Sequence, residues 1–329
     1  MSYELPKKFV TTIVGSYPYF PEALKAFQLR KRGKKNHEYN ELVKKAIEKA
    51  VRDYISAGVD LISDGEQRRE DMAVFFAEEL RGFEISGYVR IFDNVYYRKP
   101  VIVDRIEWDH EIIVEDWEYA TKVAQGRPVK VTLTGPYTMY SWSFDKYYGD
   151  MRKAILDLAE ALSHEIKVLA EKEAKYIQID EPALSTNPKK EDVLLAKEAL
   201  EILLGKLSNV RRILHVCYGK VERLFPEVLD FPIDQLDLEL KNSKYALLKT
   251  LKEFSFDKEL GFGVIDVHNE RIESVDEIFE DIKLGIEIVS PEKIFVKPDC
   301  GLKRLKREIA LAKLRNMVNA ARKAREELA

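Results

Sequence analysis

The sequence has few cysteines and lacks the features of a membrane or nucleic-acid-binding protein. Only two cysteines occur among 329 residues, too few for a disulfide framework, so a reducing cytoplasm is the expected location. No apolar run reaches the length of a membrane span, and the N-terminus (MSYELPKKFV) lacks the apolar region of a signal peptide. The formal net charge is −3, which argues against a broad basic surface. We therefore expect neither nucleic acid nor a membrane as a partner.

The chain also lacks Gly/Ser-rich linkers, low-complexity segments and clear repeats. It consists instead of short apolar or alternating runs separated by longer amphipathic stretches, such as 39–58, 150–174 and 307–328. The runs cover residues 11–16, 61–66, 129–135, 176–184, 212–217, 235–240, 261–266 and 293–300. Strands alternating with helices indicate parallel pairing. Eight such units predict a single α/β domain over 1–329, a (β/α)8 TIM barrel, with a doubly wound sheet as the alternative. Residues 83–116 are expected to form a β-hairpin insertion after the second strand.

Polar side chains gather where these predicted strands end. The groups at the ends are Gly15 and Ser16, Asp64 and Glu66, Thr134, Asp180 and Glu181, His215 and Cys217, Glu239, Asp266 and His268, and Asp299 and Cys300. In a TIM barrel the active site is assembled from the carboxyl ends of the strands. The predicted fold therefore brings both cysteines and two of the five histidines to one face.

His215 and Cys217 are candidates for a metal site. Residues i and i+2 of a strand point to the same side, so the imidazole and the thiol lie together. Taken alone, this pair is better explained as a buried core cysteine beside a core histidine. Cys300 and Glu239 end two other strands, however, and His, Cys, Glu and Cys make a tetrahedral zinc set. We therefore predict one zinc ion per chain.

A structural zinc is the alternative to a catalytic one. Structural sites usually draw on compact Cys-x-x-Cys knuckles, and this sequence has none. The position of the four predicted ligands at the active-site face favours a catalytic zinc. Two thiolate ligands suit the activation of a substrate thiol better than the activation of water.

Seven stretches, in order along the chain, resemble the C-terminal catalytic barrel of cobalamin-independent methionine synthase. They are VGSYP (14–18), DGEQRREDM (64–72), LTGPYTMYSWSF (133–144), QIDEPAL (178–184), HVCY (215–218), DVH (266–268) and KPDCGLK (297–303). The resemblance implies a TIM barrel and a methyltransferase that methylates the sulfur of L-homocysteine to give L-methionine.

The resemblance also implies a role for individual residues. His215, Cys217, Glu239 and Cys300 match the zinc ligands. Val14, Gly15 and Ser16 match the contact with the homocysteine carboxylate, and Glu66 and Asp180 match the acids that hold its ammonium. His268 matches the proton donor, and Trp142 matches the aromatic residue that stacks on the methyl donor.

The sequence departs from the family on the donor side. The second, N-terminal half of the full-length enzyme has no counterpart in this sequence. A separate protein that resembles that half is therefore one candidate partner. An Arg-Cys pair that touches folate stands here as Tyr96-Tyr97, and a folate-facing glutamate as Thr186. We therefore expect a methylcorrinoid, carried by a protein, in preference to methylfolate.

Two other functions are compatible with the residues. One is a corrinoid-dependent methyltransferase for another thiol, such as coenzyme M, although a thiol without an amine has no use for Asp180 and Glu66. The other is a zinc-stabilised paralogue without catalysis, which the complete ligand set argues against.

Overall fold

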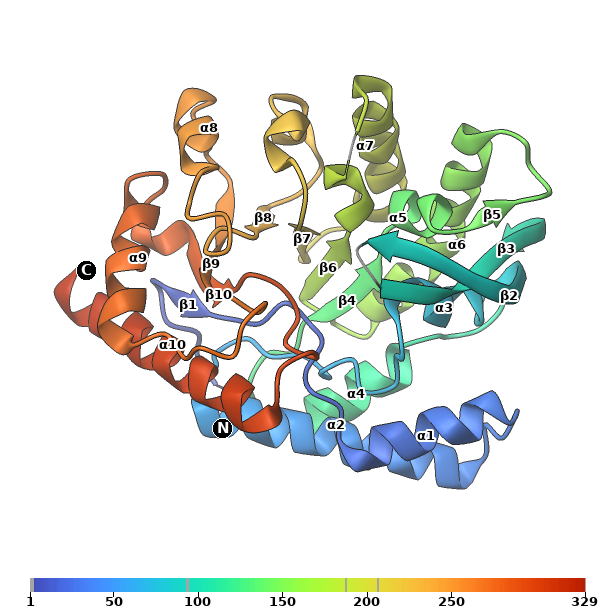
Figure 1. Ribbon diagram of the computed structural model, residues 1–329, viewed down its shortest axis with the longest axis horizontal. Helices are drawn as coiled ribbons and strands as arrows, with labels where there is room; N and C mark the ends of the chain where they lie inside the picture. The colour runs from blue at the N-terminus through green and yellow to red at the C-terminus, as the bar shows by residue number, and fades with distance from the viewer. Residues whose placement is uncertain (1–2, 93–94, 187, 206, 329) are drawn as a thin grey trace. The chain divides into compact units, whose positions relative to one another are not determined.

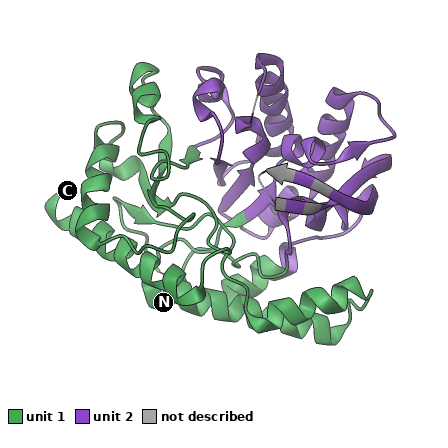
Figure 2. Ribbon diagram, in the orientation of Figure 1, with its two compact units in different colours: residues 1–68, 116–131, 235–329 green, residues 69–115, 132–234 purple. Residues whose placement is uncertain are grey.

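The computed structural model describes residues 3–92, 95–186, 188–205 and 207–328. The chain forms two compact units, which Figure 2 colours separately. Unit 1 contains residues 1–68, 116–131 and 235–329, and unit 2 contains residues 69–115 and 132–234. Among the described helices, none combines the length and the apolar character that crossing a bilayer requires.

Unit 1 contains parallel strands and the helices that follow them (Figure 1). Its strands are β1 (Val10–Thr11), β8 (Gln235–Leu238), β9 (Glu259–Ile265) and β10 (Ile294–Pro298). Its helices are α1 (Pro21–Lys31), α2 (His37–Ala57), α4 (Val114–Val123, which begins in unit 2), α8 (Leu248–Glu253), α9 (Val275–Ile286) and α10 (Arg307–Glu327), with a 3-10 turn η4 (Pro291–Lys293). The order β1-β10-β9-β8 is parallel throughout.

Unit 2 contains the remaining parallel strands and a small second sheet. The parallel strands are β4 (Val131–Thr134), β6 (Tyr176–Asp180) and β7 (Arg211–Val216). Its helices are α3 (Met72–Ala77), α5 (Pro136–Ser141), α6 (Met151–Glu171) and α7 (Lys190–Leu204), with 3-10 turns η1 (Pro182–Ser185), η2 (Val221–Leu224) and η3 (Glu227–Asp230). Strands β6 and β7 pair in parallel, from Tyr176 opposite Arg211 to Asp180 opposite His215. The predicted α/β class and parallel pairing are confirmed.

Seven of the eight predicted strands are present as named strands. The one predicted at 11–16 is confined to β1 (Val10–Thr11), and the one predicted at 61–66 is reduced to isolated bridges. Leu61 and Ile62 form only isolated parallel bridges, to Thr12 and Val129 respectively. The extended backbone ends soon afterwards because Gly65 and Glu66 both adopt left-handed conformations, with φ of 69° and 53°. Two consecutive residues in the left-handed region turn the chain out of the extended conformation.

The predicted hairpin insertion is present with a different end. Strands β2 (Arg81–Phe92) and β3 (Val95–Glu107) pair antiparallel, and β5 (Phe144–Asp145) joins β3 (Figure 1). The predicted boundary at 116 was wrong, because the chain after Glu107 bonds to α6 instead. The indole N–H of Trp108 and the backbone N–H groups of Ile112 and Ile113 all donate to the buried carboxylate of Glu165. Residues 93–94 of the predicted hairpin lie outside the described residues.

The long helices begin and end where the sequence supplies caps. The side chain of Asn36 accepts the N–H of Tyr39 at the start of α2, and Gly58 ends that helix with φ 86°. Asp150 caps α6 in the same way. The buried face consists mainly of Ala, Val, Ile and Tyr in α2 and of Ala, Ile and Leu in α6. This apolar spacing is what allowed both helices to be predicted from the sequence.

Candidate active site

Strand β7 and the turn after it position His215 and Cys217. The two side chains are buried, with exposed fractions of 2% and 4%. The turn is left-handed at Tyr218 and Gly219, with φ of 61° and 68°. A Cβ on Gly219 would lie 2.2 Å from the carbonyl oxygen of Ser185, so only glycine fits. The Ser185 hydroxyl donates to the Cys217 carbonyl at 2.8 Å, which fixes the end of the strand.

The predicted thiol and imidazole ligands come together. His215, Cys217 and Cys300 each offer one ligand atom, and these three atoms all lie within 4.8 Å of one another. Neither of these two cysteines is in a disulfide. Two sulfurs and an imidazole nitrogen form the donor set that zinc prefers, and they leave one tetrahedral position for another ligand. The cluster can therefore bind a metal such as zinc.

The end of β10, which carries Cys300, is held by two buried charged residues. Asp299 accepts the N–H groups of Leu240, Lys241 and Asn242 at 2.7 to 2.9 Å. Burial raises the pKa of Asp299 to about 6, although these N–H groups oppose the shift. Lys297 donates to the carbonyl oxygens of Leu238 and Asp299. These contacts tie the residues after β10 to the residues after β8.

Glu239, the predicted fourth ligand, lies in this segment after β8. In the described part of the chain, the group that meets metal-site spacing contains the other three predicted ligands without Glu239. Its carboxylate accepts the Asn242 side chain at 2.7 Å and lies 3.2 Å from Nε2 of His268. That hydrogen bond raises the pKa of His268, while partial burial opposes the shift. The role of Glu239 as a ligand stays a prediction.

The segment 14–16 meets the loop after β10 inside unit 1. The Gly15 carbonyl accepts the hydroxyls of Tyr54 and Ser63 at 3.2 and 3.1 Å. The Ser16 carbonyl accepts the N–H of Leu302 at 2.7 Å. A Cβ on Gly301 would lie 2.0 Å from the Ser16 hydroxyl oxygen, so glycine beside Cys300 permits this close approach. Val14 is buried at the start of the segment.

Glu66 follows the bridge residues and is half-buried. Its backbone N–H donates to the Asp64 carboxylate at 2.9 Å, which stabilises the left-handed turn. Arg68, two residues further along, donates to both carboxylate oxygens of Asp116, at 2.6 and 2.7 Å.

Asp180 and Trp142 lie in unit 2. Asp180 is buried at the end of β6 and accepts the Gln178 side chain at 2.6 Å. It is the register partner of His215 in the parallel pair β6–β7. Trp142 ends helix α5, where its N–H donates to the Thr138 carbonyl, and it is half-buried. Of the altered donor-side positions, Tyr96 and Thr186 are exposed, and the Tyr97 side chain lies outside the described ones.

Sequence reasoning gave no role to Glu181, the residue after Asp180. Glu181 is fully buried, and its two carboxylate oxygens accept the N–H groups of Tyr137 and Thr138 at 3.0 and 2.7 Å. Burial raises the pKa of Glu181 to about 7, against the effect of these hydrogen bonds. Its backbone N–H donates to the His215 carbonyl at 3.0 Å. The signal available in the sequence was an acidic pair directly after an apolar run.

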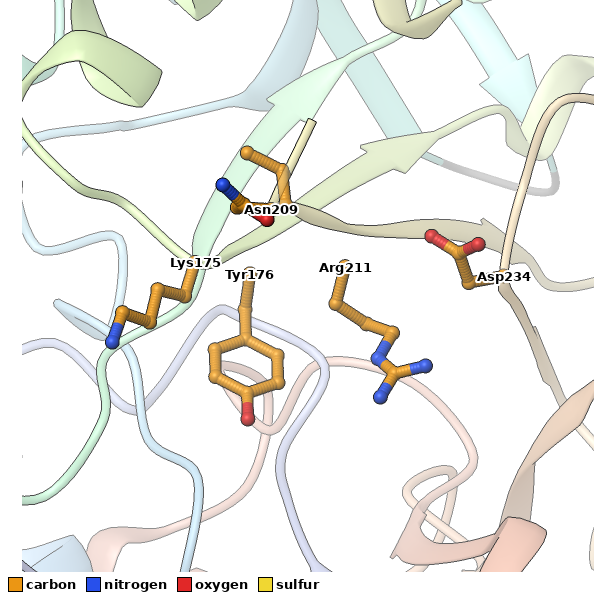
Figure 3. Close-up of a pocket in the computed structure, with 6 residues that line it drawn as sticks. Lys175, Tyr176, Asn209, Arg211 and Asp234 are labelled. Carbon is orange, nitrogen blue, oxygen red and sulfur yellow. The ribbon is translucent and has the colours of Figure 1, made fainter. Parts of the chain in front are cut away.

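A cavity of about 360 Å³ lies at the opposite, amino-terminal ends of β6 and β7 (Figure 3). It is lined by Lys175, Tyr176, Asn209, Val210, Arg211 and Asp234. The Asp234 carboxylate is already paired with Arg212 at 2.8 Å. Because active sites of parallel α/β folds lie at the carboxyl ends, this cavity is separate from the candidate site.

The carboxyl ends of the parallel strands supply an imidazole and two thiols, which define an α/β protein with a cluster that can bind a metal such as zinc. The family profile described as "Cobalamin-independent synthase, Catalytic domain" matches residues 9–323. The methionine synthase of Saccharolobus solfataricus is 42% identical over 319 residues, 97% of this chain and 95% of that protein. The methionine synthase of Sulfolobus acidocaldarius is 43% identical, over 97% of this chain and 93% of its own.

A solved structure agrees with these sequence comparisons. The B12-independent methionine synthase from Shewanella sp. W3-18-1, solved in complex with selenomethionine, superposes with a TM-score of 0.87. The identity is 25%, and the match covers 98% of this chain and 99% of that one. The chain therefore belongs to the cobalamin-independent methionine synthase family and is a methyltransferase. The resemblance seen in the sequence motifs is confirmed.

Proposed function

We propose that this protein transfers a methyl group to the sulfur of L-homocysteine and so produces L-methionine. The cluster of His215, Cys217 and Cys300, in a chain of this family, is the observation that carries the proposal. Zinc held by these residues, one ion per chain, would lower the pKa of the homocysteine thiol and keep it a nucleophile. Glu239 is proposed as the fourth ligand. It directly follows β8, which pairs with β9, and its carboxylate lies beside His268 of the same unit. Both thiols must stay reduced, which suits the cytoplasm.

We assign the amino-acid part of homocysteine to the residues around the cluster. Asp180 and Glu66 are the anions proposed for its ammonium group. Asp180 is buried, so an ion pair there would be strong. Val14, Gly15 and Ser16 are proposed for its carboxylate, because backbone N–H groups and the Ser16 hydroxyl suit an anion.

We further propose that residues 1–329 form one methyltransferase barrel of the (β/α)8 type. The bridges from Thr12 to Leu61 and from Ile62 to Val129 support it, because they add an eighth segment next to β1. The hairpin β2–β3 is then an insertion into this barrel, between its second and third strands.

For the methyl donor we propose a methylcorrinoid, bound to a protein in the cell. Three positions that contact folate in the family are occupied here by Tyr96, Tyr97 and Thr186. A methyl group on Co(III) leaves without a proton, whereas methylfolate requires protonation of its nitrogen. His268, the proposed proton donor, and Trp142, proposed on the donor side, are the residues that would serve methylfolate if it is used.

A methyl-transfer assay with the zinc-loaded protein tests the proposal. Homocysteine is supplied with methylfolate, methylcobalamin or a methylated corrinoid protein, and coenzyme M replaces homocysteine in a parallel series. We expect methionine from the corrinoid donors, little from methylfolate, and no methylation of coenzyme M. A zinc-loaded protein that methylates homocysteine from none of the three donors contradicts the proposed function. Efficient transfer from methylfolate alone contradicts only the choice of donor.

A further inference from the structure

Helix α5 begins with an unusual cap. Its N-cap residue is Gly135, which has no side chain to accept the free N–H groups of the first turn. Helices usually satisfy these groups with a local Ser, Thr, Asp or Asn. Here the acceptor is Glu181, which lies 43 and 44 positions further along the chain from the two N–H donors. The cap therefore links two distant segments of unit 2.

Glycine at the N-cap is a consequence of this link. A Cβ on Gly135 would lie 2.1 Å from a carboxylate oxygen of Glu181, so any other residue would displace the carboxylate. A local cap would have stabilised the helix without burying a charge. Burying a carboxylate is costly unless it is well hydrogen-bonded. The geometry thus favours a contact that holds α5 to β6 over one that only stabilises α5.

Further hydrogen bonds extend the link in both directions. The Gly135 N–H donates to the Asp180 carbonyl at 2.9 Å, and the Ala183 N–H donates to the Thr138 hydroxyl at 3.2 Å. One turn later, the Thr138 carbonyl accepts the N–H of Trp142. Asp180 is the residue proposed for homocysteine, and Trp142 is the residue proposed for the donor. Both are therefore connected to the Glu181 carboxylate through a few hydrogen bonds.

We infer that Glu181 is a positioning residue, which sets the placement of Trp142 on the donor side relative to Asp180 on the homocysteine side. The inference rests on the proposed function for the roles of those two residues. Glu181 itself touches neither substrate, because its carboxylate is fully buried against the first turn of α5.

Glu181→Gln tests the inference, with Glu165→Gln as the matched control. A glutamine keeps one acceptor oxygen but points an NH2 group at the other N–H donor, so α5 must move. Displacement of a reacting group by about 1 Å can cost roughly a hundredfold in rate. We expect kcat/KM to fall about ten- to a hundredfold in Glu181→Gln. Glu165 is equally buried and accepts three N–H groups, but it lies on α6. Glu165→Gln should lower Tm and leave kcat/KM within about twofold.

A rescue variant separates positioning from simple helix capping. Gly135→Ser together with Glu181→Ala supplies a local cap and removes the link to β6. We expect the double variant to have a higher Tm than Glu181→Ala alone, closer to that of the wild type, while its kcat/KM stays low. Recovery of both would show that Glu181 serves α5 stability alone and would overturn the inference.

The position of Trp142 can be read without any turnover. In a background of Trp108→Phe and Trp117→Phe, acrylamide quenching reports on Trp142, and Glu181→Gln should increase it whereas Glu165→Gln should not. Equal quenching in both variants, or equal loss of kcat/KM, would overturn the inference. If the wild-type protein methylates homocysteine from no donor, the proposed function fails, and the quenching comparison still decides whether Glu181 positions α5.

Discussion

The two ends of strands β6 and β7 differ in burial and in what their polar groups do. At the carboxyl ends, Asp180 and His215 are 7% and 2% exposed. At the amino-terminal ends, an open cavity is lined by Tyr176 and Arg211, and Asp234 is paired with Arg212 (Figure 3). Charges at the exposed end are screened by water, whereas groups at the buried end interact strongly. The candidate site therefore lies at the buried end of these two strands, and a surface ion pair lies at their exposed end.

The largest expected effect comes from removing a thiol at the carboxyl end. Cys217→Ser should lower zinc affinity at least about a hundredfold, because serine is a far poorer ligand for zinc than a thiolate. Competition with a chromophoric chelator measures the affinity. Arg211→Ala, in the same strand at the other end, is the control and should bind zinc as the wild type does. Unchanged zinc affinity in Cys217→Ser would contradict the metal site.

At either end of β6 and β7, we expect the backbone of the turn after β7 to be the least tolerant of substitution. Gly219→Ala should lower the free energy of unfolding by about 3 kcal/mol, because alanine is disfavoured at positive φ and its Cβ meets the Ser185 carbonyl. Gly149→Ala is the matched control, with φ 60° and no heavy atom within 4 Å of the new Cβ. It should cost only about 1 kcal/mol. Urea denaturation of both variants checks the difference, and equal losses would count against the steric explanation.

The buried acid at the carboxyl end should matter to substrate and not to metal. Asp180→Asn should weaken homocysteine binding by about 2 kcal/mol, since it removes a charge-assisted hydrogen bond to the ammonium group. Zinc affinity should stay as in the wild type. Isothermal titration calorimetry of the zinc-loaded variant with homocysteine tests this. Wild-type affinity for homocysteine in Asp180→Asn would remove Asp180 from the pocket.

The smallest effect is expected at the exposed end. Burial favours the neutral form of Asp234, but the hydrogen bonds and charge of Arg212 outweigh it and lower the pKa of Asp234. A lowered pKa in the folded state adds stability above the ordinary aspartate range, and this stability is lost as pH falls through the lowered pKa. Because the pair is partly exposed, Asp234→Asn should cost only about 0.5 to 1 kcal/mol at pH 7.

The same variant can be examined in acid. At a pH below the lowered pKa, Asp234→Asn and the wild type should unfold at similar urea concentrations. Asp234 of the wild type is then neutral in the folded and in the unfolded protein. A loss that persists unchanged in acid would mean that the ion pair is not its cause.

Much of the architecture could be predicted because local pattern decides it. Runs with strand character and stretches with helical spacing each bury one face, so their periodicity shows in the sequence. The pair of His215 and Cys217 could be placed on one side of a strand for the same reason. The second strand was predicted too long because its length depends on the left-handed turn at Gly65 and Glu66. The hairpin end was missed because Glu165, far along the chain, binds the residues that follow it.

The sequence by itself therefore determined the element types, the parallel α/β class and the candidate residues for the site. Tertiary structure alone decided which of those residues meet. Cys300 lies near His215 and Cys217, and Glu239 lies beside His268. Glu181 accepts the N–H groups at the start of α5, whose N-cap is a glycine. The physical reason is that each of these contacts joins segments far apart in the chain. A sequence pattern records the burial and periodicity of one segment, but not the partner that a buried polar group finds in another.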